Sequence, residues 1–133
     1  MRSISCLSLL AVVGVIWLTV PAFAGDDPSI QGEQRAGIQQ AMKHFVGEHS
    51  RDGALLHYDP VGGELRRLKL EELHSGIVKK GDFYVSCADF RDQAGTLVDV
   101  DFLVLDMGDS FHVNQAIVHA VDGEKRAYHL ESQ

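Results

Sequence analysis

The chain has 133 residues, with 12 lysines and arginines against 19 aspartates and glutamates, and its formal net charge is −7. This length predicts one compact domain once any targeting segment is removed. The acidic balance argues against nucleic acid as a partner, because phosphate binding requires a basic face that releases counterions. Anionic membrane surfaces are disfavoured for the same reason.

The N-terminal segment is typical of a secretory signal. One basic residue, Arg2, precedes an apolar run from Cys6 to Val20, which Pro21 interrupts. Ala22-Phe23-Ala24 then supplies the small-x-small pattern that signal peptidase recognises. We therefore predict cleavage directly after this motif.

Cleavage has consequences for compartment, membrane association and cysteine content. We expect residues 1–24 to be a cleaved signal peptide and residues 25–133 to form a single domain, periplasmic or secreted. The alternative is an uncleaved anchor, because Ser3 to Gly25 is 23 uncharged residues long and a spanning helix needs about 20. After cleavage we expect no membrane association, a formal charge of −8 and one cysteine, Cys87, which rules out an intramolecular disulfide.

One helix is expected at the start of the domain. Asp27-Pro28 is typical of a helix cap followed by proline in the first turn, and Ser50 to Gly53 ends the helical pattern. Three glycines, Gly32, Gly37 and Gly47, indicate places where the helix lies close to a sheet. The apolar stripe at helical spacing consists of Ile30, Ile38, Ala41, Met42 and Phe45.

After the helix the apolar period changes to two, which is typical of strands. Residues 65–78 are expected to form a long, bent strand with a kink at Gly76. Asp122-Gly123 indicates a two-residue hairpin turn in which Val121 faces Glu124. The other strand segments are residues 54–58, 83–90, 96–105, 111–121 and 124–130.

This order of elements predicts an α+β fold, with one N-terminal helix packed on an antiparallel meander of four to five strands. The plan resembles the cystatin-like folds, a group that includes the NTF2-like and PepSY-type domains, over Asp27 to Leu130. Cys87-Ala88-Asp89-Phe90 and Asp99-Val100-Asp101-Phe102 also resemble small exported bacterial domains of unknown function. These resemblances imply a compartment and a fold, and no activity. The expected core side of the last hairpin consists of Phe111, Val113, Ile117, Val121, Tyr128 and Leu130.

Three aspartates form the most specific local feature. Asp99 and Asp101 are two residues apart in a predicted strand, so their carboxylates project from one face. Asp89 lies on the preceding strand, at a register that the sequence leaves open. Three carboxylates on one face are candidate ligands for Ca²⁺, a hard cation that prefers oxygen. The alternative is a solvated face balanced by Arg66, Arg67 or Lys69 on a neighbouring strand.

The histidines and the cysteine have no motif around them. The seven histidines lack the close pairs typical of a zinc site, so we expect half-buried surface residues; the alternative is a three-histidine site assembled from distant segments. Cys87 alternates with Phe83 and Val85, which predicts a buried, inert thiol; the alternative is an intermolecular disulfide. The histidines are His44, His49, His57, His74, His112, His119 and His129.

The sequence contains no nucleophile, phosphate-binding or His-Glu-x-x-His motif. It therefore favours a non-catalytic exported domain that binds a protein, a peptide or a small ligand on its sheet, without a cofactor. One alternative is a small pocket enzyme of the NTF2-like type, with His44, Tyr58 and Asp101 as acid–base groups. Another is a calcium-responsive module that uses Asp89, Asp99 and Asp101.

Overall fold

The computed structural model describes residues 25–127. The predicted signal peptide, residues 1–24, lies outside the described residues, as do Tyr128 and Leu130 of the expected C-terminal strand. Between residues 25 and 127, no helix is both long enough and apolar enough to cross a membrane.

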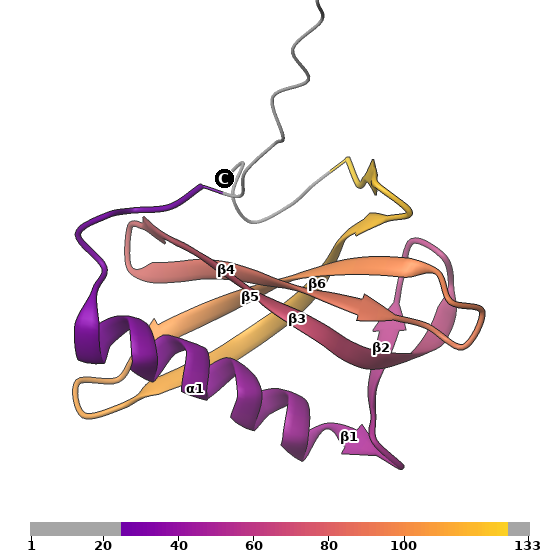
Figure 1. Ribbon diagram of the computed structural model, residues 1–133, viewed down its shortest axis with the longest axis horizontal. Helices are drawn as coiled ribbons and strands as arrows, with labels where there is room; N and C mark the ends of the chain where they lie inside the picture. Colours follow the sequence, from indigo (N-terminus) through magenta and orange to yellow (C-terminus); the bar gives the residue numbers. More distant parts are fainter. Residues whose placement is uncertain (1–24, 128–133) are drawn as a thin grey trace, which may run out of the picture.

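Over the described residues, one helix accompanies an antiparallel sheet, which confirms the α+β class (Figure 1). Within residues 25–127, seven strands pair in sequence order as a continuous meander, more than the four to five expected. The first strand has two residues, too few to show the alternation from which strands are predicted, whereas the last strand lies within the predicted segment 124–130. The elements are α1 (Gly32–Glu48), β1 (Ser50–Arg51), β2 (Ala54–Asp59), β3 (Glu64–Lys80), β4 (Phe83–Arg91), β5 (Leu97–Asp106), β6 (Phe111–Val121) and β7 (Glu124–Lys125).

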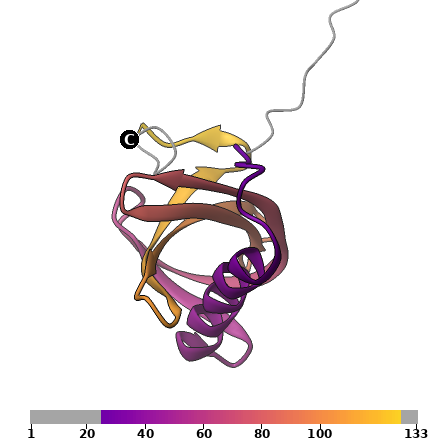
Figure 2. The same cartoon turned by 90° about the vertical axis from the view of Figure 1, so that its left-hand side faces the viewer.

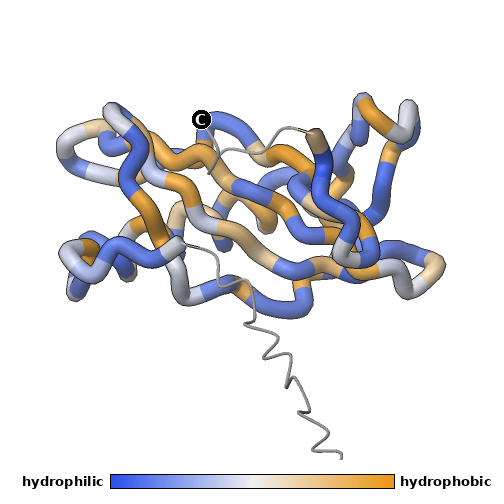
Figure 3. The backbone as a smooth tube through the Cα atoms, turned by 90° about the horizontal axis from the view of Figure 1, so that it is seen from above, coloured by the Kyte–Doolittle hydropathy of each residue, from blue (hydrophilic) through white to orange (hydrophobic). Residues whose placement is uncertain are grey.

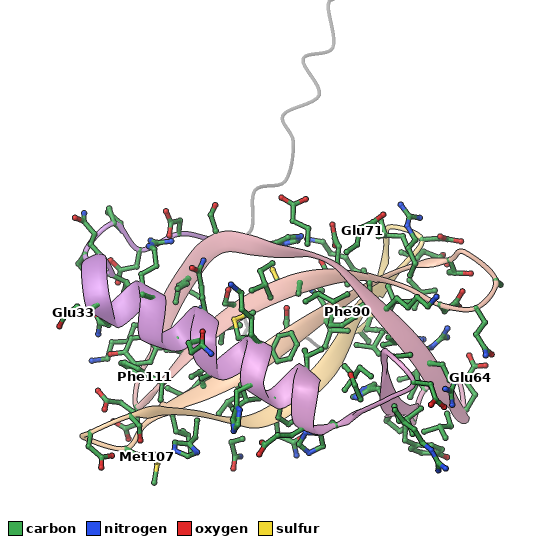
Figure 4. All side chains as sticks on the ribbon, turned by 60° about the horizontal axis from the view of Figure 1, so that its bottom comes forward. Glu33, Glu64, Glu71, Phe90, Met107 and Phe111 are labelled. Atoms are coloured by element: carbon green, nitrogen blue, oxygen red, sulfur yellow. The ribbon has the colours of Figure 1, made fainter. Side chains whose placement is uncertain are left out.

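Helix α1 lies against one face of the curled sheet (Figure 2). It begins at Gly32 and not at Asp27-Pro28; Asp27 instead accepts a 2.9 Å hydrogen bond from the Ser29 backbone N–H and shapes a turn before the helix. The predicted close approach occurs at Gly37, where a Cβ would lie 2.7 Å from Phe111 Cδ2, and Figure 4 shows that ring beside α1. The same prediction is wrong for Gly32 and Gly47, where a Cβ would meet nothing within 4 Å. The buried side chains of α1 are Ile38, Ala41, Met42 and Val46.

The face of the sheet toward α1 carries the hydrophobic core. Strand β5, inside the sheet between β4 and β6, shows the predicted alternation, with Val98, Val100, Phe102 and Val104 all buried in the core. The Phe102 ring packs edge-on against Phe45 of the helix, with ring centroids 6.0 Å apart. The same alternation of apolar and polar residues is visible along the strands in Figure 3. This apolar contact joins the helix to the sheet.

The core side of β6 differs from the prediction at one position. Ile117 was expected to face the core, but Ala116 and Val118 occupy the core instead. The pairing of β5 with β6 shifts between Leu103 and Val104, and one extra residue in a strand inverts the side-chain alternation beyond it. The prediction that Val121 faces Glu124 across the last turn is confirmed.

A buried ion cluster joins the two ends of the meander. Asp59 of β2 is 1% exposed, and its Oδ2 lies 2.9 Å from Arg66 Nε and 2.6 Å from Arg126 Nη2. Burial acts to raise the pKa of Asp59, but the hydrogen bonds from Arg66 and from the Gly62 N–H, with the charge of Arg126, outweigh it and hold the pKa below 3.8. Arg66 is therefore paired here and does not balance the three predicted aspartates.

Candidate functional site

Strands β4 and β5 place the three predicted aspartates on the sheet face opposite the helix. Asp89 lies directly across from Asp99, and Cys87 directly across from Asp101. Because Val100, between the two β5 aspartates, faces the core, the aspartates project to the other side. We call this side the second face. Asp99 and Asp101 therefore share one face, as their spacing predicted. The pairing register of β4 with β5, which the sequence left open, places Asp89 beside Asp99.

A hydrogen-bonded turn sets that register. The Asp92 carboxylate accepts hydrogen bonds from the backbone N–H groups of Ala94 and Thr96, both at 2.9 Å. The Asp92 N–H donates in turn to the Thr96 carbonyl at 3.1 Å. Such side-chain capping of a short turn fixes the residue at which two strands begin to pair. The turn therefore brings Asp89 opposite Asp99.

Two β-bulges bring histidines from the flanking strands to the second face. In β3, pairing with β4 is irregular between Leu73 and Ile77, and His74 lies within this irregularity. In β6, His119 is the extra residue opposite the Asp99–Val100 step of β5. A bulge breaks the regular alternation and redirects a side chain, and bulges are common beside functional sites. Both histidines thereby face the β4–β5 pair.

The bulge in β3 is held by hydrogen bonds from its surroundings. The buried Ser86 hydroxyl donates to the Gly76 carbonyl at 2.8 Å, and the Arg35 guanidinium of α1 donates to the Ser75 carbonyl. These hydrogen bonds provide partners for carbonyl groups in the irregular part of β3. Backbone polar groups away from water need such partners, because an unpaired buried carbonyl costs free energy. The kink predicted at Gly76 is thus confirmed, and it serves to position His74.

His119 lies against two of the aspartates in a dry environment. Its Nδ1 lies 3.0 Å from Asp101 Oδ1 and 3.6 Å from Asp99 Oδ2. His119 is 5% exposed and Asp101 is fully buried. Burying polar and charged groups costs free energy unless they are paired, so this contact stabilises both side chains. The expectation of half-buried surface histidines is wrong for His119.

His74 connects the cysteine to the third aspartate. Its Nδ1 lies 2.9 Å from Cys87 Sγ, and its Nε2 lies 3.2 Å from Asp89 Oδ2. Cys87 is 1% exposed, as predicted, whereas the side chains of His74 and Asp89 are 27% and 26% exposed. The cluster is therefore closed around the sulfur and open to solvent beside His74 and Asp89.

Asp99 lies at the centre of the cluster and is electrostatically strained. Burial raises the pKa of Asp99 to about 6; nearby His119 and His74 oppose this rise, and the carboxylates of Asp101 and Asp89 add to it. Within residues 25–127, its buried Oδ1 has no hydrogen-bond partner. A strongly shifted carboxyl group with an unused buried oxygen is a mark of a binding or catalytic site.

Two sets of potential metal ligands overlap at Asp99. One donor atom each from His74, Cys87 and Asp99 lie within 4.8 Å of one another, and so do donors from Asp99, Asp101 and His119. Imidazole, thiolate and carboxylate together suit zinc and similar borderline ions. Calcium prefers oxygen ligands alone, and here each of two predicted aspartates, Asp89 and Asp101, is in contact with a histidine.

Sequence reasoning named the aspartates of this cluster but not its nitrogen and sulfur donors. His74, Cys87 and His119 come from three strands, and no local spacing connects them. The one available signal was Cys87, two residues before Asp89 on the same strand face. The histidines had no such signal, because a bulge is visible only when two strands are paired.

The residues considered for a pocket enzyme do not converge. His44 is exposed on α1 and Tyr58 is 61% exposed on β2, whereas Asp101 is buried on the second face. Tyr58 instead lines a separate open pocket of about 370 Å³ between the end of β2 and β6, where residues 57–60 face residues 115–118.

Comparison with known proteins gives no relative from which to assign this cluster. No protein-family model matches the chain. No curated protein matches it, and no solved structure does so either. The class of protein is therefore defined by its fold and its donor cluster alone.

Proposed function

We propose that the chain is an exported, non-catalytic binding domain of cystatin-like architecture, and that the ligand on its sheet is a divalent transition-metal ion. The observation that carries the proposal is the convergence of His74, Cys87, Asp99, Asp101 and His119 from four neighbouring strands. This proposal combines two of the expectations from the sequence: a ligand held on the sheet, and a cation held by aspartates.

The surroundings of the donors support metal binding over a purely structural role. The buried carboxylate of Asp59 has hydrogen bonds at both oxygens: Oδ1 accepts from the backbone N–H groups of Val61 and Gly62, and Oδ2 accepts from Arg66 and Arg126. Asp99 instead keeps a raised pKa and a buried oxygen that bonds to nothing in the described chain. A divalent cation would supply the missing positive charge and the missing contact.

A second candidate function is nucleophilic catalysis by Cys87, with His74 and Asp89 as its partners. The His74 ring lies 2.9 Å from the Cys87 sulfur on one side and 3.2 Å from the Asp89 carboxylate on the other. This is the arrangement of a nucleophile, its base and an orienting acid. Cys87 is only 1% exposed, however, so a substrate has no direct approach to its sulfur. A metal ion needs only the opening beside His74.

Titration calorimetry of the purified protein with Zn²⁺, and separately with Ca²⁺, tests the proposal. We expect zinc binding that Asp99→Asn weakens at least tenfold. The control Asp82→Asn removes an equal charge from an exposed turn and leaves binding unchanged. Calcium binding with no zinc binding would favour the calcium-responsive alternative, and binding of neither ion would end the metal proposal.

The exported location has its own test. Intact-mass measurement of the purified protein from a host with a secretion pathway should give a chain that begins at Gly25. A mass that retains residues 1–24 in the folded, membrane-extracted protein would support the uncleaved anchor instead.

A further inference from the structure

We propose that the cluster binds two divalent metal ions, bridged by the carboxylate of Asp99. This inference rests on the proposed metal-binding function and specifies its stoichiometry. One ion would be held by His74, Cys87 and Asp99, and the other by Asp99, Asp101 and His119.

The first argument is the number and grouping of the donors. Within residues 25–127 five side chains converge, but a zinc ion in a protein takes four ligands in most sites. The donors form two triads that share only Asp99. Three protein ligands with one open position is the usual arrangement of an ion that also holds water. Two ions with one shared carboxylate use all five side chains without crowding either ion.

The second argument is the distance that the cluster spans. His74 lies on β3 and His119 on β6, with β4 and β5 between them. Three strand spacings separate the two backbones, about 14 Å in a regular sheet. Metal–imidazole bonds are about 2.0–2.1 Å long, so one ion would have to draw both rings to the centre of the sheet. Two neighbouring ions, typically about 3.5–4 Å apart in two-metal sites, divide this span.

The third argument is the different surroundings of the two Asp99 oxygens. Oδ2 lies 3.6 Å from His119 Nδ1 and so belongs to the triad with Asp101. Oδ1 is buried and without a hydrogen bond in the described chain, and the donors of His74 and Cys87 lie within 4.8 Å of an Asp99 oxygen. A bridging carboxylate places one oxygen on each ion. Asp99 has both oxygens available for such a bridge.

Asp89 has a different part in this arrangement. His74 directs Nδ1 toward the Cys87 sulfur and Nε2 toward Asp89 Oδ2. A histidine that binds a metal through one ring nitrogen almost always donates its other N–H to a carboxylate or carbonyl, which fixes the ring. Asp89, although predicted as a ligand, is therefore a positioning residue for His74.

The two sites differ in chemistry, which makes them distinguishable. The Cys87 site contains sulfur, and a thiolate bound to Co²⁺ produces an intense near-ultraviolet charge-transfer absorption. The Asp101–His119 site contains only oxygen and nitrogen and produces none. Co²⁺ titration of the purified protein, followed by absorbance and by equilibrium dialysis, should therefore give two ions bound per chain but charge-transfer intensity for one.

Three variants assign the ions. Cys87→Ala should bind one Co²⁺ without the charge-transfer absorption, and His119→Ala should bind one with it. Asp99→Ala should weaken both sites at least tenfold. Circular dichroism of each variant in chelator shows whether the variant still forms the sheet. The number of ions bound by the wild-type protein tests the proposal even if a variant does not fold.

The outcomes separate this inference from the proposed function. One ion per chain, weakened together by all three substitutions, would overturn the bridge and leave the metal-binding function intact. Two ions that both persist in Asp99→Ala would overturn the bridge alone. The absence of any bound ion in the wild-type protein would overturn both.

Discussion

The two faces of the sheet come from the same strands and bury opposite kinds of side chain. On β5, Val100 and Phe102 enter the core toward the helix, and Asp99 and Asp101 alternate with them on the second face. Phe102 and Asp101 are both fully buried. Apolar residues on the first face contribute directly to stability, whereas buried carboxylates on the second face reduce stability unless they are compensated. The second face is thus the part of the fold that stability alone does not explain.

The largest expected effect lies on the first face. Phe102→Ala removes a fully buried ring that contacts Phe45 and Phe90, so we expect it to lower the free energy of unfolding by about 3–5 kcal/mol. Urea denaturation measures this change. The control Met107→Ala, at a side chain 59% exposed in the β5–β6 turn (Figure 4), should change it by less than about 0.5 kcal/mol. Equal effects would contradict the assignment of the core.

A compensated carboxylate should behave differently from those on the second face. Asp59→Asn leaves Arg66 and Arg126 without their common partner, and we expect a loss of about 3 kcal/mol at pH 7. Because the folded-state pKa of Asp59 lies below 3.8, its contribution is fully present above about pH 4 and disappears as the pH falls through that lower value. Unfolding curves that show no difference between wild type and variant at pH 7 would contradict the pairing.

Asp99 should show the opposite dependence on pH in metal-free protein. Its pKa is raised from 3.8 to about 6, so the folded state holds this proton more tightly than the unfolded chain. The resulting stabilisation is present below pH 3.8 and is lost as the pH rises through 6. In chelator at pH 7.5, Asp99→Asn should therefore raise the free energy of unfolding, by about 3 kcal/mol. A destabilised variant would show that Asp99 is already compensated without metal.

The smallest expected effect is on metal affinity, and it separates the metal ligands of the second face from Asp89, which orients His74. Asp89→Asn leaves the ligands in place but weakens the orientation of His74, and we expect metal affinity at the Cys87 site to fall about tenfold. The matched control is Glu72→Gln, at an exposed position directly across from Asp89 on β3. Competition with a chromophoric chelator measures both affinities, and equal affinities in the two variants would remove the positioning role.

The first face was largely predictable because one rule determines it. Apolar side chains at every second position from Val98 to Val104, and at helical spacing around Ile38, are enough to define a strand, a helix and their contact. Strand β1 could not be predicted, since two residues have no period, whereas β7 lies within the predicted strand segment 124–130. The start of the helix was also misplaced, because Asp27 caps a turn and not the helix.

The second face was predictable only in part. The spacing of Asp99 and Asp101 showed that they share a face, but the position of Asp89 depended on how the Asp92 turn closes. His74 and His119 could not be placed at all, because each lies at a bulge that arises from strand pairing. An extra residue in one strand has no signature in that strand alone. The histidine donors, which with Cys87 distinguish a transition-metal site from a calcium site, were therefore hidden from the sequence.

The central claim is that the second face is completed by a metal ion, and thermal unfolding tests it most directly. A ligand that binds only the folded state stabilises it, by about 2.7 kcal/mol at a concentration one hundred times its dissociation constant. We predict that the purified protein melts at a higher temperature in micromolar Zn²⁺ than in chelator, and that Asp99→Asn loses this increase. Identical melting temperatures for the wild-type protein in zinc and in chelator would contradict the account.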